Sequence, residues 1–394
     1  MNAIGIIAEY NPLHNGHVYQ MEEAVRLAGS DAVAVAMSGD CVQRGEPAIL
    51  DKWERSRLAV QCGADVVIEI PSFYCLSDAG GYAAAGTCIL EALGCVTHLS
   101  FGSESGDAAS LKLAASNLDE HNAEIDEKIK DLRESGMPYP AARAAAYKEI
   151  CRGMPPLPDE PNDILAVEYI RSCEYMQPLP VKRQGAGYND TNPDDGVFLS
   201  AAGVREKLMA GDAVNSFVPS ETAEALAGGI LTFSDEWLDY LKYAVLSASA
   251  EEIDRCPSGG EGIGNRLKDK IAGAETWDGF ILSVKTRRYT YTRLSRLCMQ
   301  IIMGIDREIY SSCRPSYLRI LALSSKGREL ISEIKKNDLC TLPVITNINK
   351  ESQQLDEGGR RLLDLDIHTS DIYNLVTGRN MESNSDYRMM PYIE

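Results

Sequence analysis

Residues 3–17 read AIGIIAEYNPLHNGH, and this stretch decides the fold of the amino-terminal half. The apolar run 3–8 has the length of a buried strand, and helical spacing of apolar residues begins at Val18. His14 and His17 therefore stand where the strand ends and a helix opens, with Gly16 between them. A helix N-terminus offers unpaired N–H groups and a positive dipole end, which attract phosphate. Two imidazoles at that end can hold an α-phosphate and stabilise the charge of a transition state.

Two other interpretations of this motif are weaker. The histidines could simply be satisfied locally on an amphipathic helix, but the junction of strand and helix is the context that a phosphate site requires. A zinc site needs further ligands, and the other three of the five histidines are far away in the sequence. Gly16 adds to the phosphate interpretation, because a residue without Cβ lets a ligand approach the backbone closely.

Strand and helix signals alternate through the first two hundred residues. Further strands are expected over 32–37, 65–70, 98–101 and 179–183, and helices over 18–27, 52–62 and 77–93. Because no hairpin dipeptides separate them, the pattern is typical of βαβ units in a parallel sheet covered on both faces. The carboxyl ends of such strands meet at one edge, which holds the ligand. We predict an α/β, Rossmann-like domain over 1–210, followed by a mainly helical part over 211–394.

Composition excludes several classes of protein. The 394 residues are 44% apolar and 25% charged, which is ordinary for a globular chain. With 39 Lys and Arg against 58 Asp and Glu, the net charge is −19, so a uniform nucleic-acid coat is not expected. No apolar run reaches 18 residues and no basic leader opens the chain, so we expect a cytoplasmic protein without membrane contact. Eleven scattered cysteines without a C-x-x-C pair do not indicate a metal cage or a redox dithiol.

Longer motifs along the chain indicate which protein family it resembles. Residues 7–17 read IAEYNPLHNGH, 37–48 read MSGDCVQRGEPA, 51–53 read DKW and 285–294 read KTRRYTYTRL. Together they resemble the tRNA(Met) cytidine acetate ligase family, within the nucleotidylyltransferase superfamily that carries H-x-G-H. Residues 63–71 and 100–104 continue the resemblance, which therefore spans most of the chain.

The resemblance implies an ATP-dependent ligase. Acetate would attack the α-phosphate of ATP to give acetyl-adenylate and pyrophosphate, and the acetyl group would then pass to N4 of the wobble cytidine of elongator tRNA(Met), giving N4-acetylcytidine. Mg²⁺ is expected as the partner of ATP, whereas acetyl-coenzyme A is not needed and DNA is not a partner. Residues 1–210 would be a nucleotidylyltransferase-like, ATP-binding catalytic domain, and residues 211–394 a mainly helical tRNA-binding domain.

By position, the resemblance also implies the ATP site. Its residues would be Ile7, Ala8, Glu9, Tyr10, Asn11, Pro12, Leu13, His14, Asn15, Gly16, His17, Val18, Tyr19, Gln20, Gly102, Asn162 and Arg183. Gly102 follows a strand at the ligand edge, and the planar fork of Arg183 suits a phosphate. Asn162 is equally well explained as a ligand of the adenine or ribose and as a plain helix N-cap.

Two more candidates come from loops. Ser200 opens the helix where the superfamily has a Ser/Thr-rich turn, although alanines replace most of the hydroxyls here. Asp40 lies in the 37–48 loop after a strand, and loops on a rigid sheet often carry function. With His14 and His17 it is a candidate catalytic residue, which would hold a cation or orient the nucleophile. The alternative for this loop is a solvated surface with an Arg–Glu pair.

One segment of this acidic chain is basic. Residues 265–329 contain thirteen Lys and Arg and six Asp and Glu, so the segment carries +7 and the remainder −26. Cations bind phosphates and tyrosines can stack on bases, so we predict that RNA docks here. The candidate tRNA-binding residues are Lys285, Arg287, Arg288, Tyr289, Tyr291, Arg293 and Arg296. The tyrosines could instead pack inward while the arginines face outward.

Two alternatives to the ligase stay open at this point. A small-molecule adenylyltransferase would need little beyond the α/β domain, so the long carboxyl-terminal half argues against it. A non-catalytic, nucleotide-sensing RNA-binding protein is disfavoured by the intact His14 and His17.

Overall fold

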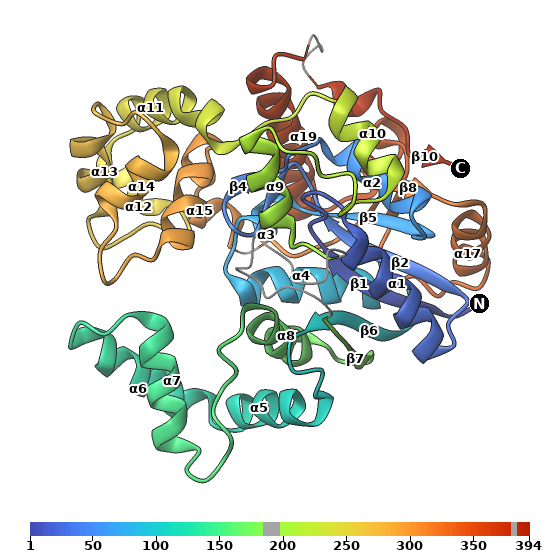
Figure 1. Cartoon of the computed structure of the whole chain (residues 1–394), viewed down its shortest axis with the longest axis horizontal. Helices are drawn as coiled ribbons and strands as arrows, with labels where there is room; N and C mark the ends of the chain where they lie inside the picture. The colour runs from blue at the N-terminus through green and yellow to red at the C-terminus, as the bar shows by residue number, and fades with distance from the viewer. Residues whose placement is uncertain (184–197, 312, 380–383) are drawn as a thin grey trace.

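The chain folds around one twisted sheet with helical layers on both sides (Figure 1). The computed structural model describes residues 1–183, 198–311, 313–379 and 384–394. The strands are β1 (Ala3–Ala8), β2 (Ala32–Ser38), β3 (Cys41–Val42), β4 (Glu46–Pro47), β5 (Val66–Ile70), β6 (Val96–Ser103), β7 (Gln177–Lys182), β8 (Leu318–Leu323), β9 (Val344–Ile345) and β10 (Tyr392–Ile393).

Helices connect these strands and build the outer layers. They are α1 (Asn15–Ala28), α2 (Lys52–Gln61), α3 (Ser72–Cys75), α4 (Ala79–Glu91), α5 (Ala108–Glu120), α6 (Asn122–Glu134), α7 (Tyr139–Ile150), α8 (Pro161–Ser172), α9 (Ala201–Ala210), α10 (Ser220–Gly228), α11 (Leu238–Ser247), α12 (Ala250–Arg255), α13 (Ile263–Ile271), α14 (Trp277–Val284), α15 (Tyr291–Ile302), α16 (Arg307–Tyr310), α17 (Ser325–Lys336), α18 (Ile348–Glu351) and α19 (Glu357–Val376). Short 3₁₀ turns cover Ser234–Trp237, Ser352–Gln354 and Ser385–Tyr387.

The main sheet has the strand order β10-β8-β5-β2-β1-β6-β7, and β9 pairs with β8. The strands β5, β2, β1, β6 and β7 are parallel neighbours, which confirms the predicted Rossmann-like sheet. β1 and β2 lie inside the sheet and are buried along their whole length, because helices cover both faces. Their carboxyl ends, after Ala8 and Ser38, open on one edge of the sheet.

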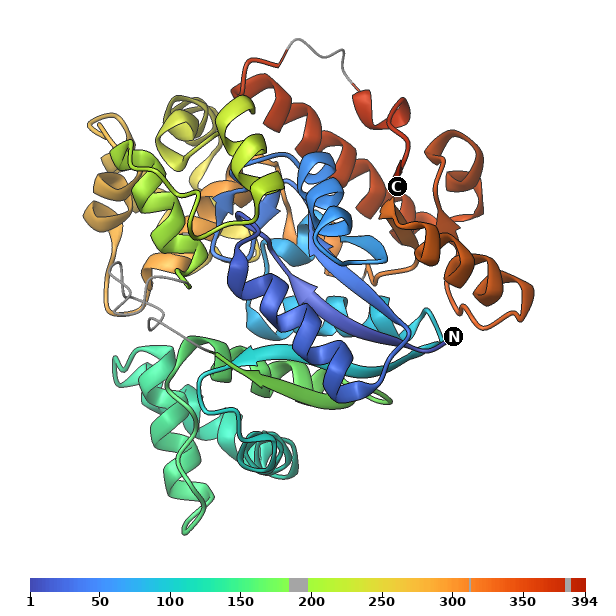
Figure 2. The same ribbon diagram turned by 45° about the vertical axis from the view of Figure 1, so that its right-hand side comes forward.

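Alternate side chains of β1 supply the two halves of the core. Ile4 and Ile6 pack with Met21 and Ala24 of α1 on one face. Ile7 packs on the other face with the cluster that contains α4 and α8. Figure 2 shows α1 crossing in front of the sheet, so the segment that follows β1 is held between strand and helix.

The carboxyl-terminal part is mainly helical, as predicted, but it also returns to the sheet. Helices α11 to α15 form a lobe with its own core around Trp237, Trp277 and Leu294. The chain then adds β8, which lies antiparallel to β5, and β10, which lies parallel to β8. The sequence reasoning expected no strands in this part. The division at residue 210 stays a prediction, with the finding that both parts contribute to one sheet.

A buried ionic cluster holds the carboxyl-terminal part of the chain against the amino-terminal half of the sheet. Lys52 Nζ lies 2.8 Å from Glu69 Oε1 and 2.7 Å from Asp386 Oδ2, and Arg319 of β8 lies within 2.9 Å of the same two carboxylates. All four side chains are at most 2% exposed. The surrounding cations hold the pKa of Asp386 below its usual range, against the effect of burial. Removal of any one partner is expected to destabilise the fold strongly, because it leaves an unpaired charge in the core.

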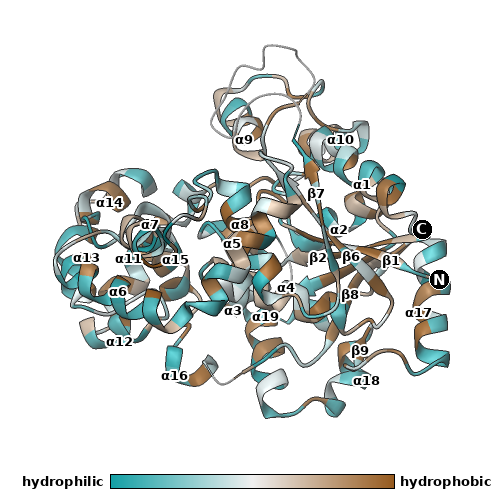
Figure 3. Cartoon of the chain, turned by 90° about the horizontal axis from the view of Figure 1, so that it is seen from below, coloured by the Kyte–Doolittle hydropathy of each residue, from teal (hydrophilic) through white to brown (hydrophobic). Residues whose placement is uncertain are grey.

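Hydrophobic residues are frequent along the strands of the sheet, whereas α6, α12 and α13 are largely hydrophilic (Figure 3). Within the described ranges, no helix combines the length and apolar character that crossing a membrane requires. All eleven cysteines are free thiols, in agreement with their scattered positions.

Candidate functional site

The H-x-G-H motif forms the first turn of α1. His14 is the N-cap of the helix, and its Nδ1 accepts a hydrogen bond from Gly16 N at 3.1 Å. His17 Nδ1 accepts from His14 N at 3.2 Å, so each imidazole satisfies one of the unpaired N–H groups of the helix start. This capping starts α1 at Asn15, three residues earlier than apolar spacing predicted.

These hydrogen bonds fix the protonation of both rings. Because each Nδ1 is an acceptor, a neutral ring carries its proton on Nε2. Burial, with a contribution from Arg183, lowers the pKa of His14 to about 3. Burial, then His14 and Arg183, lowers the pKa of His17 well below its ordinary value. The two rings stack with centroids 3.7 Å apart, so the motif presents two neutral N–H donors at the positive end of α1.

Gly16 is required by this stacking. A Cβ at this position would lie 2.9 Å from His14 Cε1 and 3.0 Å from its Nδ1. Any larger residue would push the His14 ring out of its capping position. Gly16 therefore leaves space for the His14 imidazole. The sequence analysis gave a different reason for this glycine, the close approach of a ligand to the backbone.

The loop between β1 and α1 holds a further donor. Asn11 is 1% exposed, and its Oδ1 accepts from Ile49 N at 2.7 Å, which fixes the orientation of the amide. Its Nδ2 is buried and has no hydrogen-bond partner among the described residues. Buried donors of this kind are usually satisfied. Since Asn11 lines the neighbouring cavity, a ligand oxygen is a suitable acceptor. Tyr10 before it adopts a left-handed backbone with φ 47°, a strained conformation that concentrates at functional sites.

Two adjoining hollows open at this edge of the sheet. A small one is walled by α1, the ends of β6 and β7 and the start of α9. A cavity of about 400 Å³ extends beside it, over the end of β1 toward α4 and α8. Both hollows are lined by His17, Gln20, Gly102, Arg183 and Ser200.

The structure brings most of the predicted ATP residues together here. Those that line one or both hollows are Ile7, Ala8, Glu9, Tyr10, Asn11, His14, Gly16, His17, Tyr19, Gln20, Gly102, Asn162, Arg183 and Ser200. The remaining four, Pro12, Leu13, Asn15 and Val18, are not among the lining residues. They belong to the same turn, where they shape the backbone.

For three of the lining residues the structure shows the neighbouring groups and the position in the local helix or strand. Ser200 caps α9, and its Oγ accepts from Gly203 N at 3.1 Å. Gly102 faces Arg183, since a Cβ there would lie 3.6 Å from Arg183 Cγ. Asn162 is the second residue of α8, whose N-cap is Glu160, so the N-cap explanation is wrong. Its Nδ2 donates to Glu104 Oε1 at 2.5 Å, and its role toward ATP stays a prediction.

Asp40 lies apart from these hollows. It is 3% exposed, its Oδ1 accepts from Lys52 N and its Oδ2 accepts from Ser370 Oγ. Oδ1 therefore binds the backbone at the start of α2 and Oδ2 binds a hydroxyl of α19, and Asp40 lines neither hollow. The hydrogen bonds of Asp40 link parts of the fold to one another, and no substrate contact is assigned to this carboxylate. Glu46 of this loop pairs with Arg205 of α9 at 2.9 Å.

The predicted RNA residues divide into two groups. Lys285, Arg287 and Arg288 are exposed, between α14 and α15. Tyr289 is 5% exposed in the core of the helical lobe, with its hydroxyl donating to Gly260 O, so its ring offers little surface to a base.

Three further predicted RNA residues are also held by the protein. Tyr291 donates to Asp278, Arg293 lies over the Tyr289 ring and donates to Ser258 O, and Arg296 donates to Gln43 O. The interpretation of inward tyrosines is confirmed for Tyr289. The exposed cations are the part of the segment that phosphates can reach, although Arg288 lies 3.8 Å from the carboxylate of Glu261.

Sequence reasoning missed one buried residue that supports the site without lining it. Arg55 of α2 is 1% exposed and donates to three backbone carbonyls, those of Glu9, Gly39 and Leu50. It thereby ties together the loops that leave β1 and β2. The 51–53 motif pointed to the start of this helix, but a buried arginine without a carboxylate partner leaves no signal in the sequence.

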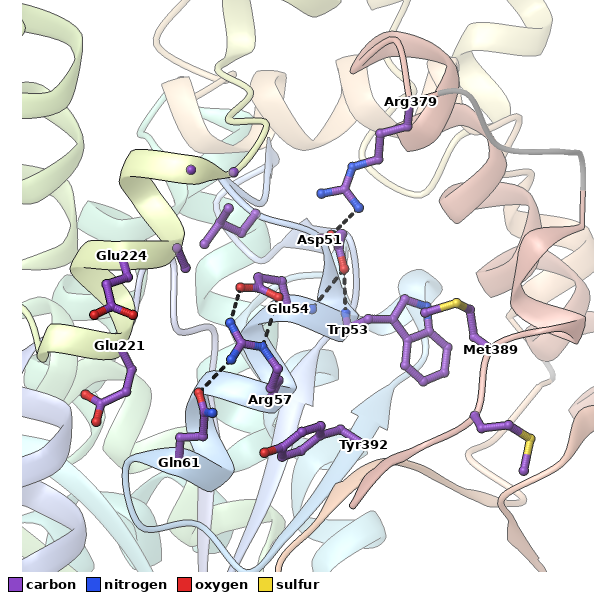
Figure 4. A pocket seen from close by; sticks show the side chains of 15 residues that line it. Asp51, Trp53, Glu54, Arg57, Gln61, Glu221, Glu224, Arg379, Met389 and Tyr392 are labelled. Atoms are coloured by element: carbon purple, nitrogen blue, oxygen red, sulfur yellow. Dashed lines mark hydrogen bonds and ion pairs between the residues drawn. The ribbon is translucent and has the colours of Figure 1, made fainter. Parts of the chain in front are cut away.

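A larger cavity of about 750 Å³ lies elsewhere, between α2, α10 and the carboxyl-terminal segment (Figure 4). Its two arginines are engaged in ion pairs: Arg379 pairs with Asp51, and Arg57 pairs with Glu54. No residue of the H-x-G-H motif lines it. The hollows at the start of α1 are therefore the better candidate.

Known proteins resemble this chain over its whole length. Residues 1–388 match the family model described as HIGH Nucleotidyl Transferase. The chain is 32% identical over 410 residues to a tRNA(Met) cytidine acetate ligase of Clostridium perfringens, with 100% of both chains covered. It is 34% identical to the protein of the same name from Syntrophotalea carbinolica, which covers 95% of this chain and 94% of that protein.

Solved structures give the same result. The fold is similar to that of Thermotoga maritima TmcAL bound with alpha-thio ATP, with a TM-score of 0.89 and 28% sequence identity. The match covers 100% of this chain and 99% of that one. The apo form of the same Thermotoga maritima protein matches with a TM-score of 0.90.

Proposed function

Because this chain belongs to the tRNA(Met) cytidine acetate ligase family of HIGH nucleotidyl transferases, we propose a division of labour among its residues. The protein is an ATP-dependent ligase that acetylates a cytidine of tRNA(Met). The proposal assigns ATP activation to the start of α1 and RNA docking to the exposed cations beside α15. Acetyl-adenylate is the intermediate that connects the two.

The first step is an attack of the acetate carboxylate on the α-phosphate of ATP. The bond from the α-phosphorus to the bridging oxygen breaks, and pyrophosphate leaves with the electron pair. His14 and His17 would donate from Nε2 to the oxygens of the α-phosphate, where negative charge is greatest. The N-terminus of α1 adds its dipole, and Asn11 Nδ2 is a third donor for the phosphate or the acyl oxygen.

Neutral imidazoles suit this task. A cationic ring would bind the triphosphate strongly before reaction, whereas a positioned N–H donor gains most where charge develops. The single observation that carries the proposal is the pair of stacked rings whose Nδ1 atoms are both occupied by the helix start. No proton transfer by these rings is needed, since a carboxylate nucleophile is already ionised.

The second step transfers the acetyl group to N4 of the wobble cytidine of elongator tRNA(Met). Lys285, Arg287 and Arg288 supply exposed positive charge for the RNA backbone. Acetate is the acyl donor in this proposal, so acetyl-coenzyme A has no role. A cytoplasmic location belongs to the same proposal, because tRNA, ATP and acetate are available there, and neither DNA nor a membrane takes part.

Mg²⁺ would accompany ATP on its phosphates. The described residues contain no group of three or more His, Cys, Asp and Glu that could hold a metal ion. The fit to a dedicated protein site is therefore poor, and no step is derived through the ion.

The test separates the two reactions. Purified protein with ATP and labelled acetate is expected to form acetyl-adenylate without RNA, and addition of elongator tRNA(Met) transcript is expected to yield N4-acetylcytidine on nucleoside analysis. Intact ATP binding without adenylate would contradict the proposal and favour a nucleotide-sensing RNA-binding protein. Adenylate formation without transfer to this tRNA would favour a small-molecule adenylyltransferase.

A further inference from the structure

The 400 Å³ cavity extends beyond the residues that it shares with the small hollow. There it is lined by apolar or aromatic side chains, among them Tyr82 of α4, Phe101 of β6, and Leu165 and Tyr169 of α8. The polar residues Asn11, Gln43, Arg44, Asn162 and Arg205 complete this part of the lining. At the end of β1 the cavity also contains one carboxylate, that of Glu9.

Glu9 is held firmly but keeps one oxygen available. Its Oε1 accepts from Gln43 N at 2.8 Å, and its backbone carbonyl accepts from Arg55 at 2.6 Å. Among the described residues no hydrogen bond reaches Oε2. A fixed carboxylate with an available oxygen, at the base of an apolar niche, suits a planar ring that carries an amine.

We propose that this niche receives the target cytosine and that Glu9 accepts a hydrogen of its exocyclic amine during acetyl transfer. The inference rests on the proposed function and adds a residue to its second step. N4 attacks the acetyl carbon, the new C–N bond forms and the C–O bond to the phosphate breaks. AMP leaves with the electron pair of that bond, and the proton lost by N4 passes to Glu9 Oε2.

The chemistry of cytosine explains why such a group is useful. The lone pair of N4 is delocalised into the ring, so the amine is a weak nucleophile until it loses its proton. General bases within hydrogen-bond reach of such a proton contribute about 10²- to 10⁴-fold to a rate. The aromatic walls would exclude water, which otherwise hydrolyses the adenylate.

The helix that follows the exposed cations packs against the loop that borders this niche. Ser295 Oγ of α15 donates to Gly45 O at 2.7 Å, and Arg296 donates to Gln43 O at 3.3 Å. Gly45 packs so closely on α15 that a Cβ would lie 2.2 Å from Arg296 N. Figure 1 shows α15 beside β4, on the side of the sheet where the loop emerges. Gln43 and Arg44 of this loop line the cavity, so the loop connects α15 with the niche.

The charges around Glu9 set its titration. Arg44 and Arg205 favour its ionised form, Glu46 disfavours it, and the rings of Tyr82 and Tyr169 lie near it. Burial outweighs the cations and raises the pKa of Glu9 above its ordinary value. Since the base must be ionised, the transfer rate is expected to fall as pH drops through this raised pKa.

The test measures the two half-reactions separately. ATP–pyrophosphate exchange with acetate reports adenylation, and single-turnover acetylation of elongator tRNA(Met) from prepared acetyl-adenylate reports transfer. Glu9→Gln keeps an oxygen for Gln43 N, so the loop is expected to stay in place. We expect transfer to fall by about 10²-fold or more, and by a larger factor than exchange, which also loses some rate because Glu9 lines the cavity assigned to ATP. Glu46→Gln, which removes a charge near Glu9 without lining the cavity, is the matched control.

Other results overturn the inference in distinct ways. If Glu9→Gln loses exchange and transfer equally, or loses neither, Glu9 is not the acceptor for N4. An equal loss in Glu46→Gln would show that only local charge matters. If wild-type protein gives no exchange, the proposed function itself fails. The wild-type pH profile of transfer needs no variant: an acidic limb that Glu9→Asp retains and Glu9→Gln lacks supports the inference, and a profile unchanged in Glu9→Gln refutes it.

Discussion

Replacement of His14 by asparagine tests the division of labour within one side chain. His14 Nδ1 caps α1 through Gly16 N, while its Nε2 is assigned to the α-phosphate. Asparagine places its oxygen close to the position of Nδ1 and is itself a good N-cap, but it has no group at the position of Nε2. The variant therefore keeps the helix start and removes one donor to the transition state.

The magnitudes follow from these two contacts. Loss of one positioned donor to a developing oxyanion costs about 10²- to 10³-fold in rate. Loss of an N-cap costs about 0.5–2 kcal/mol in stability. We therefore expect His14→Asn to lose about 10²- to 10³-fold in pyrophosphate exchange at nearly unchanged stability. His14→Ala should show the same kinetic loss together with about 1 kcal/mol lower stability.

The assay pairs exchange kinetics with urea unfolding on the same preparations. His14→Gln is the complementary variant, because its amide reaches toward the Nε2 position but caps poorly. Exchange within threefold of wild type in His14→Asn would refute the assignment of Nε2. A loss of exchange that simply follows stability across the three variants would show that His14 is only a cap.

Three further predictions concern other parts of the molecule. Lys52→Met, which leaves Glu69 and Asp386 partly unpaired in the core, is expected to cost about 3–5 kcal/mol in urea unfolding, and a cost below 1 kcal/mol would show that the cluster is not tightly coupled. Replacing Arg287 and Arg288 together by alanine is expected to weaken tRNA binding and to reduce the slope of log K against log salt by about 2, measured by filter binding, whereas an unchanged slope would place the RNA elsewhere. Because the folded pKa of His14 is about 3, the unfolded chain binds more protons than the folded chain between about pH 3 and pH 6.5. The contribution of His14 to stability is thus fully present above pH 6.5 and is lost on acidification through this window, which unfolding at a series of pH values would show and a His14→Asn background should reduce.

Much of the site was predictable because its signals are local. A strand-length apolar run followed by H-x-G-H predicted β1 and the helix after it, although α1 begins three residues earlier than the apolar spacing indicated. The phosphate site at this junction stays a prediction. Ser200 was predicted at a helix start and caps α9. These predictions depend on neighbouring residues in the chain, and tertiary packing only confirms them.

The features that escaped prediction depend on distant partners. β8 reads as a short apolar run broken by Arg319, and this arginine is buried only because Glu69 and Asp386 receive it. Asp40 looked like a loop carboxylate near the site, yet Ser370, far away in the sequence, holds it in the core. Charge counting likewise included Arg319 in the basic segment 265–329, although this arginine is buried. The sequence shows the charge of a side chain, but it does not show whether that side chain is buried.

The central claim is that His14 and His17 donate from Nε2 to the phosphate that acetate attacks. A crystal structure of the protein with a non-hydrolysable analogue of acetyl-adenylate tests this most directly. We expect phosphate oxygens within hydrogen-bond distance of both Nε2 atoms, with both Nδ1 atoms still bound to the start of α1. A phosphate bound elsewhere, or imidazoles turned away from it, would contradict the account.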